Sequence, residues 1–204
     1  MLYEYLDRNF KNGEPILLSE FPEWASREDI NKLIKDGRLK RYSNGIYYKS
    51  YNTSLGIPGT INSYDIFIKK YLKPNGVVSG YYTGLRLYNG FGFTTQNPAW
   101  YEICTNSATT PTRKVKIRNL KVILYKPVAP ITEKNVGALQ FLDLMRDINI
   151  YCELDDADRN WAIKRYIDIQ KPDINEIRKY LPLYPLRIYK NLYEGGILGE
   201  LAQG

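Results

Sequence analysis

One short segment, residues 26–50, limits the possible folds of this chain more than any other. Ser26 and Asp29 have the spacing of a capping box, in which each side chain bonds a backbone amide at the start of a helix. Apolar residues spaced three and four apart then form one stripe, and Gly37 is the residue type that commonly ends a helix in the left-handed conformation. The pattern therefore predicts a short amphipathic helix that begins after Ser26 and ends at Gly37.

A basic β-hairpin is predicted directly after this helix. Residues 38–50 (RLKRYSNGIYYKS) are β-prone on both sides of Asn44-Gly45, a pair that suits a two-residue type I′ turn because both central residues need positive φ. Upstream, residues 1–10 have helical apolar spacing, and the apolar run at residues 16–24 predicts a second, brief helix. This order is that of the winged helix-turn-helix, whose recognition helix enters the DNA major groove and whose hairpin wing reaches the backbone or minor groove.

Positive charge is concentrated on the same helix and hairpin. Residues 26–50 contain seven Lys or Arg and three acids, whereas residues 1–25 contain two and five. Arginine can bond guanine, asparagine can bond adenine, and lysine contacts phosphate. An ordinary solvated helix face is the plainer interpretation, and Glu28 opposes DNA contact, but the basic wing favours DNA. The candidate DNA-binding residues are Arg27, Asn31, Lys32, Lys35, Arg38, Lys40, Arg41 and Asn44.

The remainder of the chain predicts a second domain and an α+β fold overall. Residues 51–60 are rich in Gly, Pro, Ser and Thr and indicate a linker. Helices are expected over residues 62–72 and 81–88, strands over 100–105, 113–118 and 122–125, and helices over 133–146, 155–169 and 173–181. The predicted organisation is a winged helix-turn-helix over residues 1–50, a linker over 51–60 and, over 61–204, an α+β domain with a small antiparallel sheet and C-terminal helices.

A second basic stretch lies at residues 113–126, which contain six cations and no acid. Because alternate residues of a strand share a face, Lys114, Lys116 and Arg118 are expected to point together. The plain interpretation is a solvated sheet face, or charge that protects an edge strand. The alternative is a second surface for phosphate, tRNA or an acidic protein. The candidate residues of this surface are Arg113, Lys114, Lys116 and Arg118.

Composition excludes several kinds of catalysis. The chain has no histidine, so Ser-His-Asp and Cys-His catalysis and histidine-ligated zinc are ruled out. Cys104 and Cys152 lie too far apart in sequence for a multi-cysteine metal motif. Acids cluster at residues 153–158, and a metal-dependent nuclease needs carboxylates that converge on a divalent cation. The same acids suit the first turn of the following helix, and that capping role is the favoured interpretation. We therefore expect no catalytic residue, no metal and no cofactor.

The cell compartment is also constrained by sequence. No stretch approaches the roughly 20 apolar residues of a membrane span, and residues 1–13 carry acids where a signal peptide needs a basic and then an apolar run. Two cysteines are typical of a reduced environment, although one disulfide stays open. These features predict a cytoplasmic protein that has no membrane partner and no small-molecule substrate.

Two stretches resemble a known family. Residues 35–42 (KDGRLKRY) with 45–48 (GIYY), and then residues 77–98 and 101–127, are similar to the AbiEi-type antitoxins, the regulator half of bacterial type IV toxin–antitoxin (abortive infection) systems. The resemblance covers about residues 1–150, and residues 155–204 match nothing in it. It implies a non-enzymatic repressor of its own operon that counters a nucleotidyltransferase toxin, and it leaves open whether the two proteins touch.

The resemblance also implies which residues meet the operator, namely Arg27, Asn31 and Lys35 of the helix and Lys40, Arg41 and Asn44 of the wing. Two rival classes remain open from the residues themselves. One is a metal-dependent nuclease with a winged-helix head. The other is a non-enzymatic module that binds RNA or protein through its basic strands.

Overall fold

The computed structural model describes residues 1–202 and confirms the α+β class. The chain forms two compact units, Met1–Lys70 and Tyr71–Gly204. The predicted linker, residues 51–60, belongs to the first unit, where Asn52 and Pro58 form an isolated bridge. Each unit has its own sheet and its own apolar core.

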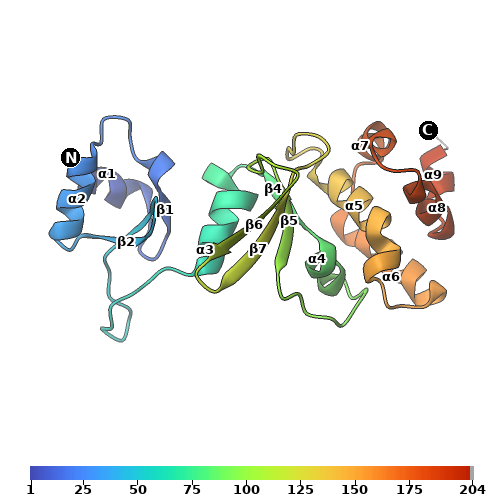
Figure 1. The fold of residues 1–204 in the computed structure, drawn as a ribbon, viewed down its shortest axis with the longest axis horizontal. Helices are drawn as coiled ribbons and strands as arrows, with labels where there is room; N and C mark the ends of the chain where they lie inside the picture. Colours follow the sequence, from blue (N-terminus) through green and yellow to red (C-terminus); the bar gives the residue numbers. More distant parts are fainter. Residues whose placement is uncertain (203–204) are drawn as a thin grey trace. The chain divides into compact units, whose positions relative to one another are not determined.

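The first unit alternates helices with short strands (Figure 1). The sheet is antiparallel throughout, in the order β1-β3-β2. The elements are α1 (Leu2–Asn9), β1 (Ile16–Leu17), the 3₁₀ turn η1 (Leu18–Glu20), α2 (Arg27–Lys35), β2 (Leu39–Ser43), β3 (Ile46–Lys49), α3 (Ser63–Phe67) and η2 (Ile68–Leu72), a π-helical turn that continues into the second unit.

The capped helix predicted after Ser26 is confirmed as α2. The Ser26 hydroxyl accepts a hydrogen bond from the Asp29 amide at 3.1 Å, and the Ser26 amide donates to the Asp29 carboxylate at 3.0 Å. Gly37 takes the expected left-handed conformation, with φ of +71°. Ile30 and Leu33 anchor the helix in the core, so its opposite face is exposed.

Two local predictions for the first unit are wrong. Residues 16–24 do not form a brief helix, because Ile16 is fully buried and pairs with Tyr47 as part of a strand, and only one 3₁₀ turn follows. The wing turn is not of type I′, since Gly45 has positive φ but Asn44 does not. The strand register shifts between Arg41 and Ser43 instead, which makes a bulged hairpin.

The second unit contains a four-stranded sheet in the order β4-β5-β7-β6. The strands are β4 (Gly80–Thr83), β5 (Tyr101–Thr105), β6 (Thr112–Ile117) and β7 (Leu120–Tyr125). Strands β5 and β7 run parallel, so the sheet is mixed and the predicted antiparallel arrangement is wrong for this pair. The helix expected over residues 81–88 begins only at Gly84, because residues 80–83 pair with β5.

Helices cover this sheet and continue to the C-terminal end of the described chain. Helix α5 contacts β4, α4, α7 and α8, and therefore forms the centre of the unit (Figure 1). Its buried residues include Phe141, Leu142 and Met145, which belong to the largest apolar cluster. The remaining elements are η3 (Pro74–Gly76), α4 (Gly84–Gly90), α5 (Val136–Tyr151), α6 (Asp156–Gln170), α7 (Ile174–Tyr180), η4 (Leu181–Leu183), α8 (Arg187–Glu194) and α9 (Leu198–Ala202).

Candidate nucleic-acid interface

A hollow of about 410 Å³ lies between α2 and the wing of the first unit. Arg27 and Asn31 line it from α2, where their spacing of four places them on one helix face. Arg41 and Asn44 line it from the wing, and the Arg41 guanidinium donates a hydrogen bond to the Asn44 side-chain carbonyl. The structure therefore brings together four of the eight predicted DNA-binding residues.

The other four predicted residues lie outside this hollow. Lys32, Lys35 and Arg38 are exposed, and the Arg38 guanidinium lies 5.3 Å from the centre of the Tyr3 ring. Lys40 is half-buried and lines a separate hollow beside the segment that follows β3. These four side chains are thus distributed around the first unit and are not gathered with the helix-and-wing group.

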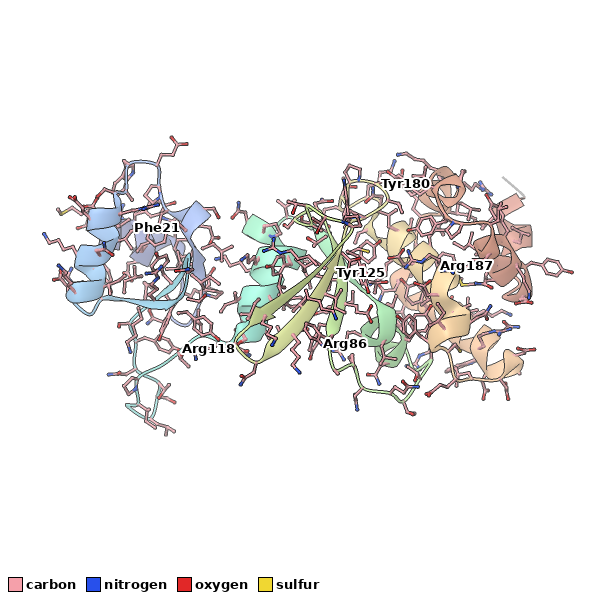
Figure 2. The ribbon with its side chains drawn as sticks, in the orientation of Figure 1. Phe21, Arg86, Arg118, Tyr125, Tyr180 and Arg187 are labelled. Carbon is pink, nitrogen blue, oxygen red and sulfur yellow. The ribbon has the colours of Figure 1, made fainter. Side chains whose placement is uncertain are left out.

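The hollow has an apolar floor below its polar rim. Leu18, Ile30 and Tyr47 supply that floor, and the Phe21 ring packs edge-on against Tyr47 at 5.4 Å between centres (Figure 2 labels Phe21). The Leu18 amide donates a hydrogen bond to the Gly45 carbonyl at 2.8 Å and so ties the wing to the strand before it. Glu28, the acid that opposes DNA contact, is exposed on α2 but does not line the hollow.

The second basic surface forms only in part. Lys114 and Lys116 are exposed on one face of β6, as predicted, and Arg113 points to the opposite face by alternation. Arg118 lies in the turn after the strand with φ of +50°, so its expected place on the strand face is wrong. Residues 118 and 119 form this turn because β6 and β7 are a tight hairpin.

Sequence reasoning missed an aromatic partner of the basic strands. The Trp100 ring lies just before β5, with the Lys114 ammonium 5.3 Å from its centre and the Lys121 ammonium 5.8 Å from it. Alternation along β5 and β7 gives part of this contact, because alternate residues of a strand share a face. The register between the two strands, which the sequence does not give, then puts residues 100, 102, 121 and 123 on the same face.

A buried carboxylate that the sequence did not single out accepts several hydrogen bonds inside the second unit. Asp143 of α5 is 2% exposed and accepts hydrogen bonds from the Tyr81 hydroxyl at 3.1 Å, the Tyr184 hydroxyl at 3.1 Å and the Cys104 thiol at 3.2 Å. The Arg146 guanidinium bonds the same carboxylate at 2.8 Å. Burial raises the pKa of Asp143 against the effect of these donors.

The two cysteines are free and show no arrangement for nucleophilic catalysis. Burial is the main cause that raises the pKa of the Cys104 thiol, and the nearby Asp143 charge raises it further. Cys152 is half-buried, and burial raises the pKa of its thiol also. A thiol with a raised pKa stays protonated near neutral pH and is a poor nucleophile.

The acid cluster at residues 153–158 serves local structure. Asp155 is confirmed as a helix cap, because its carboxylate accepts a hydrogen bond from the Asp158 amide at 3.0 Å at the start of α6. Glu153 accepts hydrogen bonds from the Thr94 hydroxyl and the Thr95 amide, and these bonds lower its pKa. Among residues 1–202, no three Cys, Asp or Glu side chains converge as a metal-binding group.

Comparison with protein-family models and with curated proteins finds no match for this chain. None of the helices in the part of the chain that the structure describes combines the length and apolar character needed to cross a membrane.

Proposed function

We propose that this chain is a non-enzymatic, DNA-binding antitoxin, whose first unit is a winged helix that binds the operator of its own operon. One observation carries the DNA-binding part: Arg27 and Asn31 of α2 and Arg41 and Asn44 of the wing line a single hollow. These residue types suit guanine, adenine and phosphate. A helix in the major groove with its wing beside it would bring the two pairs to neighbouring parts of the duplex.

The order of elements supports the same proposal. Helix α2 is followed at once by the β2–β3 hairpin, which is the proposed wing. Strand β1 pairs with β3 and so holds the hairpin in a three-stranded sheet. This is the order expected for a recognition helix and its wing. The short 3₁₀ turn at Leu18–Glu20 takes the place of the helix that usually precedes the recognition helix.

The antitoxin part of the proposal rests on the resemblance of residues 1–150 to AbiEi-type antitoxins. The proposed functional partner is a nucleotidyltransferase toxin, and the proposed location is the cytoplasm, which the composition of the chain favours. In this proposal the basic strands of the second unit contribute to neutralisation of the toxin, through Lys114, Lys116 and Arg118. The metal-dependent nuclease has no support from a converging carboxylate cluster in residues 1–202.

The DNA-binding part is tested on duplex DNA from upstream of the gene. The variant Arg41→Ala removes one wing cation, and the salt dependence of binding should fall by about 0.9 in log–log slope if that cation contacts a phosphate. Arg8→Ala removes an exposed cation of α1 and serves as the matched control. Equal binding and equal salt slope for Arg41→Ala and the unchanged chain would contradict the proposal.

The antitoxin part is tested by growth during co-expression with the nucleotidyltransferase encoded beside the gene. The unchanged chain should restore growth, and the triple change Lys114→Glu, Lys116→Glu and Arg118→Glu should abolish rescue while leaving operator binding intact. Full rescue by the triple variant would place the activity elsewhere in the chain. Failure of the unchanged chain to rescue would refute the antitoxin proposal but not the DNA-binding one.

A further inference from the structure

The second unit contains a cavity of about 250 Å³ between one face of the sheet and α5. An apolar cavity of about 150 Å³ can hold a benzene ring, so this one has room for a larger planar group. The Tyr125 and Tyr151 side chains form part of its wall, together with Pro111 and Val128 (Figure 2 labels Tyr125). The cavity therefore combines ring surface with polar groups, as small-ligand sites do.

Strand register places Thr83 and Glu102 next to each other on the cavity floor. They are paired residues of β4 and β5, so both side chains point to the same face. Gly84 follows Thr83 with φ of +56°, and a Cβ atom at this position would overlap the Glu102 carboxylate. Only glycine both adopts this conformation and leaves space for the carboxylate.

Two polar groups of the floor have unused hydrogen-bonding capacity. Thr83 is 3% exposed and precedes α4, yet its side chain does not cap that helix, and its hydroxyl has no hydrogen-bond partner in residues 1–202. Glu102 accepts one hydrogen bond through Oε2, from the Tyr125 hydroxyl at 2.8 Å. Its Oε1 atom has none within the described chain. Both residues line the cavity, so a ligand there can bond the Thr83 hydroxyl and the free oxygen of the half-buried Glu102 carboxylate.

The charges around the cavity balance. Glu102, Asp143 and Asp147 contribute three carboxylates, whereas Lys126 and Arg146 line the same space with two cations. Arg187 of α8 adds a third cation through its hydrogen bond to the Asp147 carboxylate at 2.9 Å. A site with no net charge favours a neutral polar ligand over a free anion or cation.

The sheet face that lines the cavity also carries basic and aromatic side chains farther along its strands. Cross-strand register pairs Lys114 with Ile123 and Lys116 with Lys121, so these lysines point to the side that carries Tyr125. The Trp100 ring lies between Lys114 and Lys121. A surface that binds single-stranded nucleic acid has two components, namely cations that contact phosphates and an aromatic ring on which a base stacks. The lysines and Trp100 supply both.

We propose that this face binds single-stranded nucleic acid and that the cavity receives one unstacked base. Lys114, Lys116 and Lys121 would contact the phosphates, and Trp100 would stack on a neighbouring base. The Thr83 hydroxyl and the Glu102 carboxylate would bond the edge of the base in the cavity. This inference concerns the second unit alone and does not depend on operator binding by the first.

The free carboxylate oxygen also selects among the bases. Guanine presents a ring N–H and an amino group side by side, and a carboxylate can accept both hydrogen bonds. Adenine and cytosine present an amino group beside a ring acceptor. The N–H of uracil lies between two carbonyl oxygens, which a carboxylate repels. The expected order is therefore guanine first, adenine and cytosine next, and uracil last.

The experiment uses the full chain and four labelled RNA pentamers, UUXUU, in which the central base X is guanine, adenine, cytosine or uracil. All measurements are repeated in the Arg41→Ala background, where a base preference that belongs to the second unit should be unchanged. We expect the guanine pentamer to bind about tenfold more tightly than the uracil pentamer, the discrimination expected of one well-formed base contact. A chain that binds all four equally would refute the cavity proposal.

Variants then separate the base contact from the phosphate contacts. Glu102→Gln and Thr83→Val keep side-chain size, and each should reduce the guanine preference to about twofold or less. Lys114→Gln with Lys121→Gln should weaken all four pentamers equally and lower the salt slope by about 0.7 for each phosphate that is no longer bound. Asp168→Asn, an exposed change on α6, is the control for removal of a carboxylate.

Two outcomes would overturn the proposal. The first is a guanine preference that survives in both Glu102→Gln and Thr83→Val, because the base would then lie elsewhere. The second is displacement of every pentamer by an acidic peptide together with no base preference. In that case the lysine face is a docking surface for an acidic protein. Thermal unfolding of each variant shows whether it is folded. If either Glu102→Gln or Thr83→Val fails to fold, the other variant still tests the base contact.

Discussion

The two units of this chain differ in where their candidate binding groups lie. The first unit buries Lys49, which pairs with Asp7 at 2.7 Å, but its candidate DNA-binding residues lie outside the apolar core. In the second unit, Asp143 lies in the interior, with partners on β4, on β5 and at the residue that follows η4. Asn135, Glu176 and Asn191 are buried there as well.

This contrast predicts how function and stability are linked in each unit. An exposed side chain such as Arg27 can be changed with little effect on folding, because water replaces its contacts. Removal of a buried carboxylate such as Asp143 would take away the acceptor that the Tyr81 hydroxyl and the Cys104 thiol bond inside the protein. We therefore expect binding and stability to be separable in the first unit and coupled in the second.

The largest expected effect is that of Asp143→Ala. The change leaves Arg146 without one of its two carboxylate partners, and it leaves the Tyr81 hydroxyl without its acceptor. Breaking a buried ion pair by removing one partner costs about 3–5 kcal/mol of unfolding free energy. Denaturant unfolding measures this loss by tryptophan fluorescence in a Trp24→Phe background, where the remaining tryptophans, Trp100 and Trp161, both lie in the second unit.

The control for this prediction is Asp168→Ala on the exposed face of α6, which should change stability by no more than about 0.5 kcal/mol. An Asp143→Ala chain as stable as the control would show that the buried carboxylate is not coupled to folding. The contrast between the units would then fail.

The next effect in size tests the base contacts proposed for the first unit. Arg27→Ala and Asn31→Ala should each relax operator preference by about 1–3 kcal/mol if the side chain bonds a base in two places. Stability should be unchanged, because both side chains are exposed. Competition between operator and scrambled duplex measures the preference. Lys32→Ala, outside the hollow, should weaken both duplexes equally, and a loss of preference there would assign base contact to the wrong helix face.

Local signals allowed the first unit to be predicted in part. Ser26, Asp29 and Gly37 determine where α2 begins and ends, and their partners lie within the same helix. The apolar run that begins at Ile16 predicts a helix. Ile16 forms a strand instead, because it pairs with Tyr47, which is distant in sequence. The two sides of the hollow were both predicted, but their meeting follows from tertiary packing of α2 against the hairpin.

The cavity of the second unit was beyond the reach of sequence patterns. Asp143 stands in a helical run as an ordinary polar residue, and its partners Tyr81 and Tyr184 come from opposite ends of the unit. Thr83 and Glu102 become neighbours only through the register of β4 and β5. The prediction of a helix over residues 81–88 also placed Thr83 on the wrong kind of element.

The smallest predicted effect, Ser26→Ala, tests whether the units unfold separately. Loss of a serine cap costs about 1 kcal/mol, because the Asp29 amide at the start of α2 loses its acceptor. Ser43→Ala, an exposed change in the wing, is the matched control. Hydrogen exchange should show faster opening of α2 and the wing in Ser26→Ala, and no change in the second unit. Asp143→Ala should do the reverse. If Ser26→Ala accelerates exchange in α5 as strongly as in α2, the two units unfold together as one cooperative body. The link between polar groups and stability then cannot be assigned to each unit separately.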